Sequence, residues 1–567
     1  MRNNKGKAFM LIVPLILLVV LIIVYRIYER NLPEQKNTET TIQTIAPTAT
    51  LEPTPESTAA PTPTPTPTPT PAPVADNAGN SSGDKVKYQV YIGTDQISNY
   101  KGKEQIVFGA PEVYDMVDGI TTFRGDNYRS GAAFGTRSVV EEKLEIVWSY
   151  DELTIVDPQW PGVGWTGQPL IVRWPEEVRK VMNLNQEFKN KDFVEVIQAA
   201  LDGNIYFLDL ETGKPTRPHI TTGFPIKGSP FVDPRGYPLL YSGMGINELK
   251  SGKTTPWKYR IFSLIDQKEI FSLPGKDPVT TRTWGAFDST GLVHAETDTL
   301  FQCGENGILY KIKLNTQFDP DKGEISINPE IVKYKYQNLY TSRLGIEVSP
   351  AIYRDLIYFA DNGGMLQCVD INTLQPKWAF NVGDDTDSTP VIEETSDGVY
   401  LYTGNEVDSQ GAVGKSTVRK INAITGEQIW SRSYECFNNN GINGGVLSAP
   451  TVGTGDIEGL VIFNITRTGT EWGGKLVALD KKTGQEVWTK TLRHYGWSSP
   501  TVFQSDEGKS YMIFCDSQGN MFLMDPKTGE TLDTVSVERN VEASPAIYND
   551  MIVVGSYARK IFGVRVK

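Results

Sequence analysis

Carboxylates gather in one short stretch of the sequence, VGDDTDSTP. This stretch places Asp384, Asp385 and Asp387 directly before a proline, and Glu347 and Glu542 stand at comparable distances before two other prolines. Ca²⁺ takes about six to eight oxygen ligands, so carboxylates that converge on one point could hold it. A solvated acidic rim is the alternative interpretation, because acidic side chains are usually exposed. We therefore name Asp384, Asp385 and Asp387 as candidate metal ligands.

Several tryptophans stand where a ligand could be bound. Three of them precede a unit of the repeat described below by three or four residues, and two lie in long polar segments. Exposed indole rings could stack on a sugar ring, a quinone or an apolar side chain of a partner. Packing against neighbouring loops is the alternative interpretation. Together with two arginines, the candidate ligand-binding residues are Trp165, Trp284, Trp497, Trp257, Trp472, Arg282 and Arg343.

No pattern in the sequence indicates a catalytic centre. The only histidines, His219, His294 and His494, lack the spacing of a metal site or of a catalytic triad. The four cysteines are widely spaced without a CxxC pair, which favours buried thiols. The net charge of -13 argues against a nucleic-acid partner, since phosphate binding needs a basic surface. We therefore predict no catalytic residue, although an enzyme stays open as an alternative.

A repeated phrase indicates which elements position these residues. SSPTVF at Ser498 recurs as VSPAIY at Val348, SAPTVG at Ser448 and ASPAIY at Ala543. Each phrase opens a unit of short segments rich in β-branched and aromatic residues, which turn residues divide into four strands. Eight such units begin at or near Pro169, Pro230, Phe287 (beside a missing proline), Pro350, Pro390, Pro450, Pro500 and Pro545. Four-stranded units at this spacing predict an all-β fold, an eight-bladed β-propeller.

Two features of the units predict how the blades pack and how the ring closes. A Thr-Gly turn recurs in LETGK, AITGE, KKTGQ and PKTGE, because glycine can adopt the positive φ that such a turn needs. Trp378, Trp430 and Trp488 follow these turns or their equivalents at one shared place, where a large ring could dock one blade on the next. The last unit has only three strands. We expect KLEIVWSYD, residues 143–151, to supply the fourth by pairing of the N- and C-terminal strands.

The motif ALDKKTGQEVW, with its upstream SAP, resembles the tryptophan-docking repeat of the pyrroloquinoline quinone (PQQ)-like β-propeller family. TFRGDNYRSG, residues 122–131, is similar to the opening phrase of many members. The resemblance covers roughly residues 120–567 and implies the propeller fold. It leaves function open, because the family includes quinoprotein dehydrogenases, the lipoprotein of the outer-membrane assembly machinery and surface proteins. The dehydrogenases use adjacent cysteines beside PQQ and Ca²⁺, and this sequence has no such pair, which favours binding without a cofactor.

The N-terminal part of the chain differs from the repeats. AFMLIVPLILLVVLIIVY is an uncharged apolar run long enough to cross a bilayer as a helix. Its flanks favour an uncleaved signal anchor with the N-terminus inside. The Pro/Thr-rich tract that follows predicts an extended linker. The expected organisation is residues 1–7 cytoplasmic, 8–25 transmembrane, 26–87 extracellular linker, 88–142 pre-propeller segment and 143–567 propeller.

The candidate residues are expected to share one face of the propeller. Connections between blades and the turns between the second and third strands of each blade lie at the same mouth of the central channel, and three of these turns are long. A short helical insertion, Glu176 to Asp192, is expected on the opposite face. We therefore expect a membrane-anchored cell-surface propeller that is a non-catalytic binding or scaffold module for an envelope protein or glycan. A PQQ- and Ca²⁺-dependent dehydrogenase and a polysaccharide-active enzyme are the alternatives.

Overall fold

The computed structural model describes residues 80–82, 86–439 and 441–567. These residues belong to the second of the two units into which the chain separates, Pro71–Lys567. The expected cytoplasmic residues 1–7, the transmembrane segment 8–25 and most of the linker 26–87 lie outside the described residues. Within the described ranges, no helix combines the length and the apolar character needed to cross a membrane.

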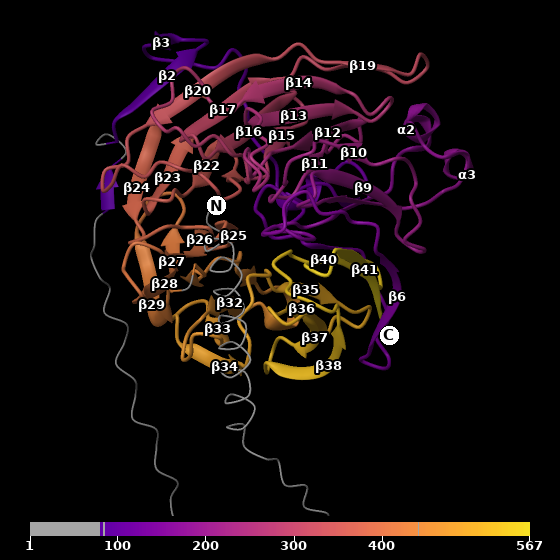
Figure 1. The fold of residues 1–567 in the computed structure, drawn as a ribbon. Coiled ribbons are helices and arrows are strands. Elements are labelled where there is room, and N and C mark those ends of the chain that lie inside the picture. Colours follow the sequence, from indigo (N-terminus) through magenta and orange to yellow (C-terminus); the bar gives the residue numbers. More distant parts are fainter. Residues whose placement is uncertain (1–79, 83–85, 440) are drawn as a thin grey trace, which may run out of the picture. The chain divides into compact units, whose positions relative to one another are not determined.

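The described residues form eight blades, and Figure 1 shows the blades following one another around a common centre. Each blade is an antiparallel sheet of four strands, in several cases extended by further strands. Short segments rich in β-branched and aromatic residues form the strands, and the glycine, asparagine and aspartate residues between them form the turns. The predicted all-β, eight-bladed propeller is therefore confirmed.

The first four blades in chain order occupy the part of the chain up to Asn381. From the inner to the outer strand of each blade, they contain β7 (Leu170–Val172), β8 (Glu195–Ala199), β9 (Asn204–Asp209) and β10 (Ile220–Thr221); β11 (Phe231–Val232), β12 (Leu239–Ser242), β13 (Lys258–Ser263) and β14 (Glu269–Pro274); β15 (Leu292–His294), β16 (Thr299–Gly304), β17 (Ile308–Lys313) and β20 (Glu330–Tyr336); and β21 (Ala351–Tyr353), β22 (Leu356–Phe359), β23 (Met365–Asp370) and β24 (Pro376–Asn381).

The other four blades follow to the end of the chain. In the same order they contain β25 (Val391–Thr395), β26 (Gly398–Gly404), β28 (Val413–Asn422) and β29 (Gln428–Phe437); β31 (Thr451–Val452), β32 (Leu460–Thr466), β33 (Gly474–Asp480) and β34 (Glu486–Leu492); β35 (Thr501–Gln504), β36 (Ser510–Cys515), β37 (Asn520–Asp525) and β38 (Glu530–Ser536); and β39 (Ala546–Tyr548), β40 (Met551–Ser556), β41 (Lys560–Val566) and β6 (Leu144–Tyr150). Inner strands start directly after the predicted prolines, and in the third blade Gly291 takes the place of proline, four residues after Phe287.

Smaller elements decorate the blades. The expected helical insertion of the first blade is present between β7 and β8, as α2 (Glu176–Val181) and α3 (Gln186–Lys189). Residues before the propeller extend the third blade outward by two strands, so the predicted pre-propeller segment contributes to the rim. The remaining elements are β1 (Asn80–Ser82), β2 (Tyr88–Ile92), β3 (Asp95–Ile97), η2 (Pro111–Val113), β4 (Gly119–Ile120), β5 (Ala133–Phe134), β18 (Gln317–Asp319), β19 (Glu324–Ser326), β27 (Glu406–Val407), β30 (Gly444–Gly445) and η3 (Gly455–Ile457).

The first and last parts of the propeller share one sheet. β6 pairs antiparallel with β41, with Trp148 opposite Gly563. The pairing that the sequence predicted for residues 143–151 is therefore observed. It places the outer strand of the eighth blade before the first blade in the chain, so the two ends of the propeller hold each other.

A tryptophan in the outer strand of one blade packs on the Thr-Gly turn of the next. Each indole nitrogen donates a hydrogen bond of 2.8 to 3.0 Å to a carbonyl of the next blade, in the pairs Trp148 with Leu210, Trp378 with Ala423, Trp430 with Lys481 and Trp488 with Pro526. The turn glycine lies against the ring, and a Cβ atom at Gly426 would come within 2.7 Å of the Trp378 ring. Gly426 also has a φ of 73°. Glycine is thus required both by the backbone and by the ring.

A segment of the opening phrase runs across the inner strands of the blades. It pairs through β4 with β7 of the first blade and through β5 with β39 of the eighth. Between these strands, Thr121 accepts a hydrogen bond from the second blade, and Asn127 and Tyr128 accept hydrogen bonds from the fourth and fifth blades. Phe123 packs against Ala449 at the start of the sixth blade. Residues 119–134 therefore tie together blades that are far apart in the sequence.

Two buried arginines complete this central segment. Arg129 is fully buried and donates from Nε to the carbonyl of Pro350 at 2.8 Å. Arg124 donates from Nη1 to the carbonyl of Pro500 at 3.3 Å. These prolines directly precede the inner strands β21 and β35, so the two arginines attach the segment to the fourth and seventh blades. Arg124 and Asp126 belong to an RGD tripeptide, and both are buried, so it is not displayed for adhesion.

Candidate binding site at the channel mouth

One position of the repeat brings side chains together around one mouth of the channel. This mouth position lies three residues before the proline, or Gly291, that precedes each inner strand. In chain order it holds Thr166, Lys227, Asp288, Glu347, Asp387, Leu447, Trp497 and Glu542. Burial alone would lower the pKa of Lys227, but Asp288, Glu305 and Glu347 raise it well above its usual value. Residues of different blades therefore act on one another at this mouth.

A first acidic group consists of Asp288, Glu305 and Glu347. Each residue offers a carboxylate oxygen, and these atoms lie within 4.8 Å of one another. Asp288 and Glu347 occupy the mouth position of the third and fourth blades, and Glu305 lies in the turn between β16 and β17. Asp288 and Glu305 are buried and Glu347 is partly buried. Lys227 Nζ lies 3.4 Å from Asp288 Oδ2, so this group already has one cation beside it.

A second acidic group consists of Asp385, Asp387 and Glu406, with carboxylate oxygens in the same close spacing. Asp385 and Asp387 lie in the connection between β24 and β25, and Glu406 belongs to β27. Asn362 links the two groups, because its Nδ2 lies 2.8 Å from Glu347 Oε1 and 3.1 Å from Asp385 Oδ2. The two acidic groups therefore form one connected site across the third, fourth and fifth blades.

Several carboxylate oxygens of the two acidic groups are left without a hydrogen-bond donor. Buried oxygens that accept no hydrogen bond from the described residues are Asp288 Oδ1, Glu305 Oε1, Asp387 Oδ1 and Glu406 Oε2. Burial, followed by the charges of Glu347 and Asp288, raises the pKa of Glu305 well above its usual range. Burial and the charge of Glu347 raise the pKa of Asp385 to about 8. Unpaired buried carboxylates are costly, so the site is electrostatically incomplete as it stands.

A bound cation would supply the missing charge. Ca²⁺ lies about 2.3 to 2.6 Å from its oxygen ligands, so two ligands of one ion are at most about 5 Å apart. The oxygens of each acidic group, within 4.8 Å of one another, meet that requirement. The second group fits better, because Lys227 already pairs with the first. The residues present therefore suit a divalent cation held by Asp385, Asp387 and Glu406.

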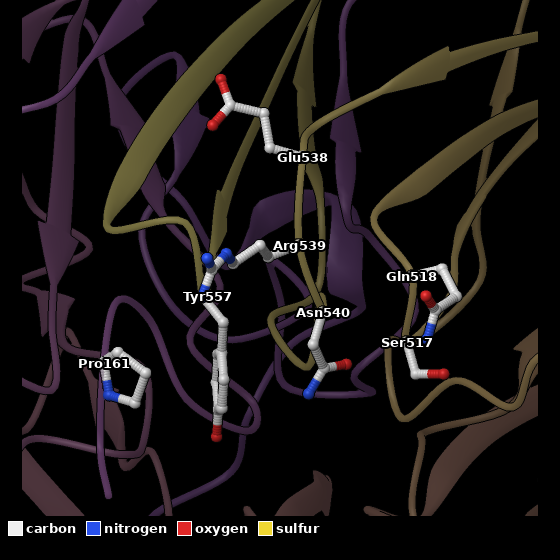
Figure 2. Close-up of a pocket in the computed structure, with 7 residues that line it drawn as sticks. All are labelled: Pro161, Ser517, Gln518, Glu538, Arg539, Asn540 and Tyr557. Carbon is white, nitrogen blue, oxygen red and sulfur yellow. The ribbon is translucent and has the colours of Figure 1, made fainter. Parts of the chain in front are cut away.

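A small polar hollow of about 300 Å³ lies on the same side of the seventh and eighth blades. Figure 2 shows its lining residues, which are Pro161, Ser517, Gln518, Glu538, Arg539, Asn540 and Tyr557. Tyr557 Oη and Asn540 Nδ2 donate to Glu542 at 2.7 and 3.0 Å. Burial nevertheless raises the pKa of Glu542, the mouth residue of the eighth blade, to about 7. The hollow thus adjoins another carboxyl group of the mouth that titrates near neutral pH.

The structure gives the candidate tryptophans different environments. Trp165 is buried and its Nε1 donates to the carbonyl of Leu447 at 3.3 Å. Trp257 is buried too, with its ring 4.8 Å from that of Trp284. Trp284 and Trp497 are half-buried, and Trp472 is 56% exposed. Packing against loops therefore describes Trp165 and Trp257, whereas the rings of Trp284, Trp497 and Trp472 are accessible to different degrees.

The candidate charged residues also have different partners in the structure. Asp384 does not join the second acidic group, because its carboxylate accepts hydrogen bonds from the backbone of Asp408 and from the side chain of Gln410. Arg343 forms an ion pair with Asp408, the residue whose backbone also donates to Asp384. Arg282 Nη1 donates to Asn362 Oδ1 at 2.8 Å and so holds the residue that links the two groups.

Sequence reasoning missed four charged residues of the mouth, which are Lys227, Asp288, Glu305 and Glu406. Lys227 and Asp288 could have been found by counting three residues back from the start of each blade, including the blade in which Gly291 replaces proline. Glu305 and Glu406 come from turns between second and third strands, where the repeat gives no fixed position.

The site lacks the cysteine pair of quinoprotein dehydrogenases. All four cysteines are buried and free, and they lie in four different blades, as Cys303, Cys368, Cys436 and Cys515. Burial raises the pKa of each thiol above its usual value. The carboxylates thus suit a cation, but the sulfur groups that would flank a quinone are not available at the mouth.

Known proteins resemble parts of this chain. A family model described as outer membrane protein assembly factor BamB matches residues 473–567. No curated protein matches the sequence. Among solved structures, BamB from Moraxella catarrhalis is 14% identical, with 70% of this chain and 98% of that chain covered and a TM-score of 0.44. A computationally designed protein, Ika8, is 12% identical, with 66% and 93% covered and a TM-score of 0.41.

A europium-containing methanol dehydrogenase is 10% identical, with 79% of this chain and 98% of that chain covered and a TM-score of 0.40. Likenesses at these levels carry no conclusion about activity. The family match covers the last two and a half blades, which include the Thr-Gly turn and the final inner-strand phrases. Residues 473–567 therefore match a repeat model of the PQQ-like type, and the other blades have the same strand arrangement.

Proposed function

We propose that this protein is a non-catalytic binding module at the cell surface, anchored through residues 8–25, whose propeller binds an envelope protein or glycan at the channel mouth. The observation that carries the proposal is the set of buried carboxylate oxygens without hydrogen-bond donors at this mouth. Such a set is unfavourable unless a ligand provides positive charge. Arg124 and Arg129 donate to the carbonyls of Pro500 and Pro350, and the proposal places the ligand among the mouth residues that come three positions before such prolines.

The ligand is expected to bind together with a divalent cation at Asp385, Asp387 and Glu406. Ca²⁺ prefers carboxylate and carbonyl oxygens and accepts further ligands from outside the protein. A cation held at this point would face the channel mouth, where long turns of the second, fifth and sixth blades surround it. The half-buried Trp497 and Trp284 offer flat apolar surfaces nearby in the chain connections, suited to a sugar ring or an apolar side chain.

The experiment compares binding of the full-length protein to isolated cell envelopes with and without a chelator. The proposal predicts that chelation, or the double substitution D387N/E406Q, abolishes most of the binding. Asp397→Asn is the matched control, because Asp397 is an exposed carboxylate of the same blade in the turn before β26. Binding that is equal in all of these samples would contradict the proposal. Protease treatment of intact cells tests the location, since an exposed propeller would be degraded.

A further inference from the structure

A second and larger hollow, of about 890 Å³, lies on the outer side of the third blade. Its floor is formed by β17, β20, β2 and β3, and the segment from Asn99 to Ile106 passes over it. This covering segment is fixed on the fourth blade, where Gly102 N donates to the carbonyl of Asn372 at 2.7 Å and Ile106 N donates to Asn372 Oδ1 at 2.8 Å. The hollow is therefore a bounded space of the size that small molecules occupy in proteins.

The wall of the hollow is mainly apolar. Aliphatic side chains come from β2, β3, β20 and the covering segment, and they are Ile92, Ile97, Ile331, Val332 and Ile106. Ile92 is 49% exposed although it sits in a strand of the extended third blade. An exposed isoleucine beside a cavity costs hydration free energy that an apolar ligand would recover.

The hollow is lined by more lysines than carboxylates. Lys103 pairs with Glu330 at 2.9 Å, and Lys313 pairs with Glu104 at 2.8 Å. Lys311, which is 7% exposed, has no carboxylate within ion-pair distance among the described residues. Its Nζ donates to the carbonyl of Ile371 at 2.8 Å and lies 5.5 Å from the ring centre of Tyr100.

Lys101 also lines the hollow, is exposed and forms no ion pair within the described part of the chain. Two amines without an ion-pair partner among the described residues thus lie beside an apolar wall, in a chain with a net charge of -13. Burial lowers the pKa of Lys311 to about 8, and the charges of Asp370 and Glu104 offset only part of that effect.

We propose that this hollow binds a free fatty acid, whose alkyl chain lies against the isoleucines and whose carboxylate meets Lys311 and Lys101. The apolar wall accounts for the alkyl chain, and the two amines without ion-pair partners account for the acid group. This site is separate from the channel mouth, because its residues come from the outer strands of the third blade and from the covering segment. It does not depend on the proposed binding function of the mouth.

The test measures binding of the fluorescent probe dansyl-undecanoic acid to the full-length protein, and then displacement of the bound probe by palmitate. We expect saturable binding of the probe, displacement by palmitate and no displacement by methyl palmitate, which lacks the charge. Lys311→Met keeps the length of the side chain and is expected to weaken palmitate binding by about tenfold or more. Ile92→Trp, which fills the hollow from an exposed position, is expected to weaken the binding of both acids.

Lys335→Met is the matched control, because Lys335 lies on β20 and does not line the hollow. Binding unchanged in both Lys311→Met and Ile92→Trp would overturn the proposal, as would equal displacement by methyl palmitate. Co-sedimentation with phosphatidylglycerol vesicles without palmitate binding would also overturn it, since the basic residues would then recognise a bilayer surface.

Discussion

The indole nitrogen of Trp378 lies 2.9 Å from the carbonyl oxygen of Ala423, and the ring of this tryptophan leaves no space for a Cβ atom at Gly426. One outer-strand side chain and one turn thus define the contact between the fourth and fifth blades. The same contact recurs at three other blade boundaries through Trp148, Trp430 and Trp488.

Gly426→Ala is expected to lower the free energy of unfolding by about 2 to 4 kcal/mol, because the added methyl group meets both a φ of 73° and the Trp378 ring. Gly508→Ala is the control: Gly508 has a φ of 81° with no atom within 4 Å of an added Cβ, and should cost only about 1 kcal/mol. Urea denaturation measures both. Equal losses would show that the ring contact contributes nothing.

Arg129→Lys is expected to lower the free energy of unfolding by about 3 kcal/mol or more, because lysine cannot reproduce the hydrogen bonds that the buried guanidinium donates to Pro350, Thr122 and Thr290. The exposed Arg559 gives the control variant Arg559→Lys, which should be close to neutral. Thermal unfolding followed by circular dichroism compares them. A fully stable Arg129→Lys protein would mean that the central segment does not tie the blades together.

Stability is expected to fall as the pH rises from about 4 to about 8. Burial raises the pKa of Asp385 to about 8 and that of Glu542 to about 7, above the value of about 4 expected in the unfolded chain. The folded state therefore binds more protons across this window, so deprotonation favours unfolding. Unfolding temperatures measured across this range should decrease for the native protein and decrease less for Asp385→Asn and Glu542→Gln. A rising curve would contradict the environment assigned to these carboxyl groups.

Addition of PQQ with Ca²⁺ is expected to leave the absorbance spectrum of the quinone unchanged and to produce no dye reduction. The reason is that the four buried cysteines lie in separate blades and cannot flank a quinone at the mouth. The measurement is a spectrophotometric titration, with a dye-linked assay on the same sample. A spectral shift that saturates at one quinone per chain would restore the dehydrogenase alternative.

The repeat made the fold predictable, whereas the site was predictable only in part. Proline phrases, Thr-Gly turns and tryptophans recur because each blade meets its neighbour in the same way, so counting them gave the number of blades. Asp385 and Asp387 were recognised because they precede such a phrase. Glu406 was not, because it lies in a long turn whose path depends on tertiary contacts.

Asp384 is a residue that the sequence predicted for the metal site but that the structure places outside the second acidic group. Its sequence position matches that of a metal ligand, but the loop after β27 folds back and saturates its carboxylate with hydrogen bonds. The central role of residues 119–134 was equally hidden, because this segment contacts blades that are hundreds of residues away and has no alternating strand pattern of its own.

Calorimetric titration of the full-length protein with Ca²⁺ at pH 8 tests the account most directly. We expect saturable binding that is lost in D387N/E406Q and retained in Asp397→Asn, because only the first variant removes carboxylates of the second acidic group. Absence of saturable Ca²⁺ binding to the native protein, or binding that persists in D387N/E406Q, would contradict the assignment of the channel mouth as a cation-dependent binding site.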